Sequence, residues 1–247
     1  MNQSQQKHDA EADPTHEMIG ELVTANHILF DRGVVDGFGH VSVRHPARPD
    51  RFLLARNMAP ARVMADDILE FDLDGNIADG RDVSVYLERF IHSEIYQARS
   101  DVNAVVHSHS PAVIPFGVTP DVQLRPIFHM SGFLGLGCPT FEIRNFAGMN
   151  SDLLIRSRDL GAALASDLGA NPAILMRGHG ATVVGDSLRR AVYRAVYMQV
   201  NAELQTTASG LGTVTFLTPG EAESAVMSVE GQLNRAWDLW AMLVRKQ

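Results

Sequence analysis

Ala104-Val-Val-His-Ser-His-Ser110 combines a short apolar run with two histidines that stand two positions apart. The valines favour a buried strand. Residues two apart in a strand point to the same side, so His107 and His109 present both imidazoles to one space. This geometry suits two ligands of a catalytic divalent metal ion, and the neighbouring serines are small enough to leave room beside it. Two ordinary polar residues at the end of a strand remain the alternative.

The segments around this stretch alternate between strand and helix patterns. Apolar residues at three-and-four spacing predict a helix over residues 15–32, with Thr15 as a possible N-cap. Short alternating or apolar runs predict strands at 40–44, 52–55, 68–73, 104–107 and 173–176, the third closing in a hairpin turn at 74–76. Further helices are expected at 83–99, 187–208 and 219–244. Residues 1–14 are polar and predict a flexible tail. The remainder, 15–247, predicts a single layered α/β domain.

Composition limits the classes of function. Among 247 residues, 45% are hydrophobic, which is enough for a proper core, and the net charge is −8. Such a chain has no basic surplus for nucleic acid or an anionic membrane surface, so a small-molecule substrate fits better. The single cysteine, Cys138, cannot form an intrachain disulfide, and no signal-peptide pattern is present, so we expect a cytoplasmic protein. No apolar run approaches the ~18 residues of a membrane span.

Two further residues are candidates for the same site. His179 lies in Arg177-Gly-His-Gly180, where two glycines allow a sharp turn that exposes the imidazole. Its alternative is a histidine in a flexible loop. Glu88 is expected to share a helix face with His92 at a spacing of four, although such a pair is usually only solvated or locally bonded.

At this point the chain resembles the class II aldolase/adducin superfamily, which includes sugar-phosphate aldolases and epimerases. The motifs that carry the resemblance occur in the family's order through nearly the whole chain after the tail. They are Gly33-Val-Val-Asp-Gly-Phe-Gly-His-Val-Ser-Val-Arg44, Asp67-Ile-Leu-Glu-Phe-Asp-Leu-Asp-Gly75, Glu88-Arg-Phe-Ile-His-Ser-Glu-Ile-Tyr96, Val105-Val-His-Ser-His109 and Gly178-His-Gly180.

The resemblance implies both a fold and a set of site residues. The fold would be an α/β/α sandwich around a mainly antiparallel sheet, assembled as a homotetramer with active sites between subunits. His107, His109 and His179 match the family's metal-binding histidines, and Glu88 matches its acidic ligand or acid/base. The metal would be Zn²⁺ or Mn²⁺. His129 falls where the aldolases carry a tyrosine that transfers a proton across the interface, and histidine can do this near neutral pH.

Departures from the aldolase pattern concern the phosphate pocket. Phe38-Gly39-His40 replaces a Thr/Ser-x-Gly-Asn motif, Ala55-Arg56-Asn57-Met58 replaces a Thr-Gly loop, and Tyr86-Leu87 replaces two serines. A dianionic phosphate needs several convergent donors, and these replacements remove them together. A phosphorylated sugar is therefore an unfavourable substrate.

The replacements instead resemble the decarboxylase branch, typified by 3-hydroxy-2-methylpyridine-4,5-dicarboxylate decarboxylase and dihydroxyphthalate decarboxylases. Phe38 could stack on an aromatic ring and Arg56 could bind a carboxylate through two hydrogen bonds, with His40 beside it. The alternatives are a core aromatic, a surface arginine paired with an acid, and a satisfied polar histidine.

The leading hypothesis is metal-dependent, non-oxidative decarboxylation of a hydroxylated aromatic or heteroaromatic carboxylic acid. Glu88 or His129 of a neighbouring subunit would donate the proton, Arg56 and His40 would orient a second carboxylate, and Phe38 would hold the ring plane. A retro-aldol lyase acting on a non-phosphorylated hydroxy-keto acid is the second hypothesis. A non-catalytic adducin-like scaffold is the third.

Overall fold

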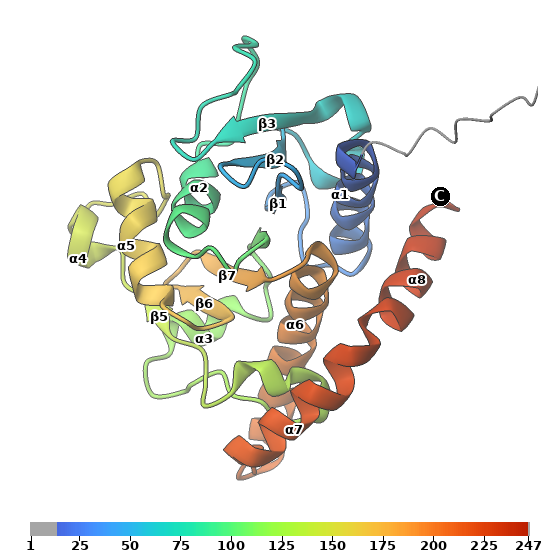
Figure 1. Cartoon of the computed structure of the whole chain (residues 1–247). Coiled ribbons are helices and arrows are strands. Elements are labelled where there is room, and N and C mark those ends of the chain that lie inside the picture. Colours follow the sequence, from blue (N-terminus) through green and yellow to red (C-terminus); the bar gives the residue numbers. More distant parts are fainter. Residues whose placement is uncertain (1–13, 247) are drawn as a thin grey trace, which may run out of the picture.

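The computed structural model describes residues 14–246, and within them one seven-stranded sheet forms the centre of the molecule (Figure 1). The strand order is β3-β2-β1-β4-β7-β6-β5, and every neighbouring pair is antiparallel except β5 and β6. The strands are β1 His40–Arg44, β2 Arg51–Ala55, β3 Ile68–Asp72, β4 Ala104–Ser108, β5 Thr140–Phe141, β6 Ala173–Met176 and β7 Gly180–Gly185. The flexible tail predicted for residues 1–14 lies outside the described part of the chain, apart from Pro14.

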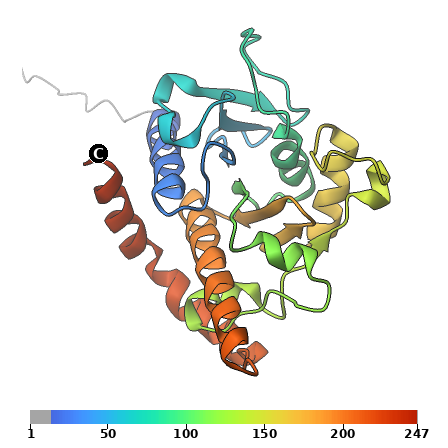
Figure 2. The ribbon, with the colours of Figure 1, turned by 180° about the vertical axis from the view of Figure 1, so that it is seen from behind.

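Helices cover both faces of this sheet (Figures 1 and 2). One face packs against α1 and α6, and the other against α2 and α5, while α8 lies outside α1 and α6. The larger helices are α1 Pro14–Asp31, α2 Arg89–Ala98, α5 Arg158–Leu168, α6 Leu188–Leu211, α7 Pro219–Val229 and α8 Leu233–Val244. Shorter ones are α3 Ile114–Val118, α4 Arg144–Ala147 and the 3₁₀ segments η1 Pro60–Arg62, η2 Ala65–Asp67, η3 His129–Leu134 and η4 Glu230–Gln232. The predicted α/β/α sandwich is therefore confirmed.

Strand β4 lies in the middle of the sheet and all five of its residues are buried. Its valines pack in the core, because β-branched side chains fit a pleated surface that is covered on both faces. His107 lies directly across from His40 of β1 and from Thr182 of β7. The fold thus buries the first histidine of the opening motif between two neighbouring strands.

Several predicted elements differ from the observed ones. The helix expected over 83–99 begins only at Arg89, with Glu88 at its N-cap. Residues 81–86 have no regular secondary structure and 87–88 form a turn. The Ser84 carbonyl accepts from the Asn57 N–H, and the Tyr86 hydroxyl donates to the Met58 carbonyl, so these residues are bonded to the segment after β2. The helix expected over 219–244 is interrupted at η4, where buried Glu230 pairs with Arg194 of α6. Strand β7 and helix α5 were not predicted.

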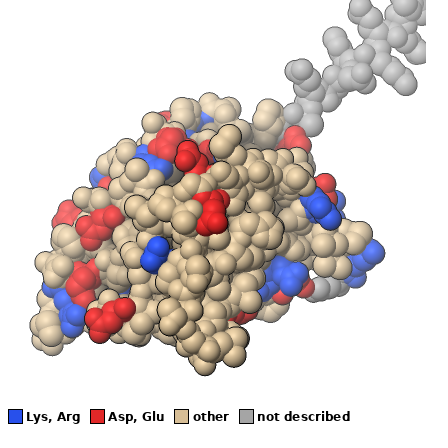
Figure 3. All heavy atoms as spheres, turned by 90° about the horizontal axis from the view of Figure 1, so that it is seen from below, with Lys and Arg blue, Asp and Glu red and all other residues tan. Residues whose placement is uncertain are grey.

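Within residues 14–246 there is no helix both long and apolar enough to cross a membrane. On the face drawn in Figure 3, acidic and basic side chains are interspersed among uncharged ones, without a continuous basic area.

Candidate metal centre

Three histidines and one glutamate converge at the end of β4. His107 and His109 come from β4 and the residue after it, His179 from the turn between β6 and β7, and Glu88 from the residue before α2. One ligand atom from each of the four lies within 4.8 Å of all the others. His109 Nε2 lies 3.0 Å from the Nε2 atoms of both His107 and His179. The structure therefore brings together all four residues that the sequence proposed as ligands or acid/base.

Glu88 completes the cluster from the opposite side. Its Oε2 lies 3.6 Å from His107 Nε2 and 3.4 Å from His179 Nε2. Its Oε1 accepts a hydrogen bond of 2.9 Å from the backbone N–H of Ile155. One carboxylate oxygen is thus held by the backbone, and the other is directed at the imidazoles.

The segment around Leu153 orients a second member of the cluster. His179 Nδ1 donates to the Leu153 carbonyl at 2.9 Å, which leaves the Nε2 lone pair free to face the other ligands. Leu153 has a φ of 71°, and it is the one non-glycine residue with positive φ within 14–246. Backbone strain of this kind persists where the surrounding structure holds it, often at functional sites.

Two glycines allow the turn that carries His179. Gly178 has a φ of 67°, a conformation that side chains with a Cβ rarely adopt. A Cβ on Gly180 would lie 2.0 Å from the Ser108 carbonyl oxygen, so only glycine permits β7 to approach β4 here. The backbone therefore requires glycine on both sides of His179.

Burial sets the protonation states of the cluster. Burial lowers the pKa of His107, and burial together with His107 and His179 lowers the pKa of His109 to about 4. Burial opposes ionisation of Glu88, but hydrogen bonds and charge from His107 and His179 outweigh it and hold the Glu88 pKa well below its usual range. Neutral imidazoles at His107 and His109 and an ionised Glu88 are the forms in which these three groups can donate lone pairs to a cation.

The donor set fits a divalent metal ion. Imidazole nitrogens about 2.1 Å from a common ion lie roughly 3.0–3.4 Å apart in octahedral or tetrahedral geometry, close to the spacing of His109 to its two neighbours. Three imidazoles and a carboxylate suit zinc, manganese and related ions. The four residues could thus hold such an ion without rearrangement of the backbone.

His40 and Phe38 lie beside this cluster but differ in exposure. The His40 ring centroid lies 5.0 Å from that of His107, and the His40 side chain is buried. Phe38 is 71% exposed, with its ring centroid 6.5 Å from that of His109. Phe38 is therefore not the core aromatic that was its alternative, and it forms part of the open side of the cluster.

Arg56 is farther out. Its Nε donates a 2.7 Å hydrogen bond to Asp67 Oδ1, and 46% of its side chain is exposed. Buried Tyr86 has its ring centroid 4.6 Å from that of His40, and the charge of Arg56 acts on the Tyr86 hydroxyl. Arg56 is thus the partly exposed arginine paired with an acid that the sequence analysis gave as the alternative to a carboxylate-binding role.

His129 does not join the cluster within one chain. It is exposed at the start of η3, where its described ring contact is with Phe128. Its predicted role needs a second copy of the chain.

Sequence reasoning missed three polar residues behind the cluster: Ser42 of β1 and His92 and Tyr96 of α2. All three are buried and hydrogen-bonded to one another or to His40. Their spacing was an available signal, because positions two apart on a strand and four apart on a helix each form one face. Leu153 and Ile155 gave no such signal, since they act through backbone groups.

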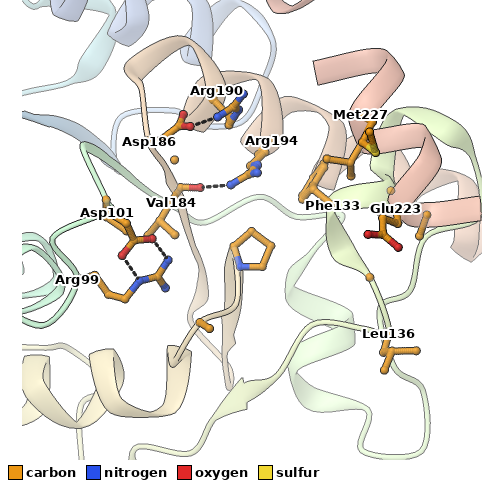
Figure 4. Close-up of a pocket in the computed structure, with 18 of the residues that line it drawn as sticks. Arg99, Asp101, Phe133, Leu136, Val184, Asp186, Arg190, Arg194, Glu223 and Met227 are labelled. Carbon is orange, nitrogen blue, oxygen red and sulfur yellow. Dashed lines mark hydrogen bonds and ion pairs between the residues drawn. The ribbon is translucent and has the colours of Figure 1, made fainter. Parts of the chain in front are cut away.

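A hollow of about 580 Å³ lies elsewhere, between the β7–α6 turn, η3 and α7 (Figure 4). We call it the arginine cleft, after Arg99, Arg190 and Arg194, which line it. Figure 4 shows Arg99 bonded to Asp101, Arg190 to Asp186, and Arg194 to the Val184 carbonyl. Its lining contains no histidine, so the cleft and the cluster are separate features.

Comparisons with known proteins agree with this geometry. The family model described as "Class II Aldolase and Adducin N-terminal domain" matches residues 20–206. Decarboxylase tropJ of Talaromyces stipitatus is 38% identical over 245 residues, covering 90% of this chain and 92% of that protein. The 3,4-dihydroxyphthalate decarboxylase of Arthrobacter keyseri is 33% identical over 214 residues, covering 79% and 82%.

Solved structures support the same fold. The L-fuculose 1-phosphate aldolase of Glaciozyma antarctica matches with a TM-score of 0.75 at 20% identity, covering 94% of this chain and 90% of that one. With the family model matching most of the chain, this protein belongs to the class II aldolase and adducin family.

Proposed function

We propose that this protein is a metal-dependent, non-oxidative decarboxylase of a hydroxylated aromatic or heteroaromatic carboxylic acid. The observation that carries the proposal is the convergence of three imidazoles and one carboxylate within 4.8 Å. Two relatives with at least 33% identity are named decarboxylases, which supports a carbon–carbon lyase of this kind over the sugar-phosphate aldolases. The absence of the aldolase phosphate donors from the motifs at residues 38–40, 55–58 and 86–87 supports it independently.

His107, His109, His179 and Glu88 would hold the ion, with Zn²⁺ and Mn²⁺ as the candidates. When bound, such an ion supplies a Lewis acid that stabilises negative charge on a phenolic or ketone oxygen. The hydrogen bonds from His179 to Leu153 and from Ile155 to Glu88 keep the ligands oriented for it.

The reaction needs one proton for each CO₂ released. The ring carbon that bears the carboxylate accepts a proton, the bond to the carboxyl carbon breaks, and its electron pair returns to the ring. Glu88 is held ionised and both of its oxygens are engaged, so it suits a ligand better than a proton donor. We therefore assign the proton donor to His129 of a neighbouring subunit, which requires the homotetramer expected for this family.

Substrate contacts would come from the open side of the cluster. Phe38 offers an exposed ring for stacking, and His40 lies beside His107 at the inner end. Arg56 would reach a second carboxylate only by exchanging or sharing its bond with Asp67. A cytoplasmic location remains our expectation.

The decisive test is a substrate panel with the metal controlled. We would remove metal with a chelator, restore Zn²⁺ or Mn²⁺ separately, and incubate each form with hydroxylated aromatic and pyridine mono- and dicarboxylates. We expect CO₂ release that depends on the ion and disappears in His107→Ala. The exposed variant Arg81→Gln, whose guanidinium pairs only with neighbouring Asp79 among the described contacts, is the matched control and should keep activity.

Each other outcome has a definite meaning. Aldehyde release from non-phosphorylated hydroxy-keto acids, without CO₂ from the aromatic panel, would replace the decarboxylase with the aldolase hypothesis. A protein that retains no stoichiometric divalent ion and acts on neither panel would favour the adducin-like scaffold.

A further inference from the structure

A chain of four buried side chains leads from the metal cluster into the core. His40 Nδ1 lies 2.6 Å from His92 Nε2, and His92 Nδ1 lies 2.6 Å from Ser42 Oγ. Ser42 Oγ in turn lies 2.7 Å from the Tyr96 hydroxyl. None of the four side chains is more than 4% exposed. The chain therefore joins β1 to α2 entirely through hydrogen bonds that water does not reach.

The number of hydrogens in this series of hydrogen bonds decides which group donates in each bond. Each link holds one hydrogen, so all three bonds must run the same way when both imidazoles are neutral. If they ran from His40 inward, the Tyr96 hydroxyl hydrogen would need a further acceptor. Among the described residues, Ser42 is the one side-chain or carbonyl partner recorded for that hydroxyl. An unsatisfied buried donor costs roughly 1–3 kcal/mol, so the inward direction is disfavoured.

In the outward direction the donor left without a protein partner is the His40 Nε2–H, which is not among the fully buried unpaired polar atoms of the described residues. Tyr96 donates to Ser42, Ser42 donates to His92 Nδ1, and His92 donates through Nε2–H to His40 Nδ1. The His40 proton must then reside on Nε2, the nitrogen that His92 does not occupy. The rings of Tyr86 and His107 both neighbour His40, with centroids 4.6 and 5.0 Å away, so this N–H lies near the candidate site.

We infer that Tyr96, Ser42 and His92 are positioning residues that fix His40 as its Nε2–H tautomer, so that His40 acts as a hydrogen-bond donor to a bound carboxylate. The first part rests on geometry alone, while the identity of the ligand rests on the proposed function.

The tautomer can be measured directly. We would label the full-length protein with ¹⁵N-histidine, load it with zinc because that ion is diamagnetic, and record two-bond ¹H–¹⁵N correlations. The His40 signals are assigned by their loss in His40→Gln. We expect both His40 and His92 to carry the proton on Nε2. A proton on Nδ1 of His40 would overturn the inference, whatever the enzyme's activity proves to be.

Substitution of Ser42 tests whether the chain causes this preference. Ser42→Ala removes the donor to His92 and should leave His92 and His40 as mixtures of tautomers. Ser93→Ala is the matched control, because Ser93 is equally buried beside His92 and its hydroxyl has no hydrogen-bond partner. An unchanged His40 tautomer in a folded Ser42→Ala protein would contradict the assignment. If Ser42→Ala fails to fold, the wild-type spectrum still decides.

A kinetic measurement links the tautomer to the ligand. For an aromatic carboxylate that the enzyme decarboxylates, we expect Ser42→Ala to raise KM roughly tenfold, the equivalent of one hydrogen bond to a charged group. Ser93→Ala should leave KM within twofold. A normal His40 tautomer with no decarboxylation would refute the proposed function and leave the positioning chain intact, so the two failures are distinguishable.

Discussion

The histidine cluster and the arginine cleft both gather ionisable side chains, but they differ in what those side chains already bind. In the cleft, Arg99 donates to Asp101, and Arg194 donates to Glu230 and to a backbone carbonyl. In the cluster, three imidazole nitrogens face one another around a single carboxylate oxygen. The cleft encloses about 580 Å³, yet its three arginines are paired within the protein.

We infer from this difference that convergent donor atoms, rather than the volume of a hollow, point to the candidate metal site. An arginine paired with an acid and a carbonyl has little to offer a ligand unless those bonds break. Lone pairs that converge on one point have no such partner inside the chain and together favour a cation. We therefore expect the cluster to govern chemistry and the cleft to govern stability.

The largest effect should follow from removing one histidine. His179→Ala deletes one of the four proposed ligands and frees the Leu153 carbonyl. We expect it to lower kcat/KM by more than about 100-fold, beyond the 10–100-fold typical of outer-shell partners. Metal content by plasma emission should fall with it. Arg99→Gln in the cleft is the contrasting variant and should retain both metal and activity. Loss of metal from Arg99→Gln would break the distinction between the two regions.

Substitutions that affect the arginines of the cleft should instead change the free energy of unfolding. Glu230 is buried on η4 and pairs with Arg190 and Arg194 of α6. Glu230→Gln removes the carboxylate that the two arginines share. Arg190 keeps its ion pair with Asp186, whereas Arg194 loses its carboxylate partner, and we expect the free energy of unfolding to fall by about 3 kcal/mol. Urea denaturation would measure the change. Metal content should stay at the wild-type level; a large loss of metal with little loss of stability would reverse our assignment.

Acid should weaken the fold through the positioning chain. Burial, with a contribution from His107, lowers the pKa of His92 from 6.5 to about 3. Between these values the unfolded chain binds a proton that the folded protein excludes, so stability is complete above pH 6.5 and decreases as pH falls. At pH 5 the loss from His92 is about 2 kcal/mol. In chelator, the stability of His92→Gln should fall less steeply than that of wild type, and equal slopes would contradict this origin.

The sequence predicted best where local pattern and burial agree. The runs that became β1, β2, β4 and β6 are short, apolar or alternating, and they lie in a sheet covered on both faces. Strand β7 was missed because it begins at Gly180 and ends at Gly185, residues that favour turns. Gly180 allows β7 to lie close to the Ser108 carbonyl of β4. This is a tertiary contact, which the local sequence pattern does not show.

The same limit applies to the helices and the site. Helix α5 contains Gly161, which resembles a helix breaker, but a Cβ there would meet the Phe90 carbonyl at 2.4 Å, so glycine permits α5 to pack on α2. The metal candidates could be proposed from short motifs and family resemblance. The supporting bonds of the Leu153 carbonyl and the Ile155 N–H could not be predicted, because every residue type has these backbone groups. The predicted helix over 83–99 also places Glu88 inside a helix instead of at its N-cap.

The smallest effect concerns the open side of the cluster. Phe38 is 71% exposed and makes few contacts that could stabilise the fold, whereas its ring lies 6.5 Å from that of His109. Stacking on an aromatic substrate contributes roughly 0.5–1.5 kcal/mol, so Phe38→Ala should raise KM about threefold with unchanged kcat and unfolding free energy. Phe146→Ala, an exposed ring on α4, should change neither kinetic constant. If Phe38→Ala instead lowered kcat strongly at unchanged KM, the ring would act on the reacting geometry rather than on binding, and the open side would belong with the cluster's chemistry.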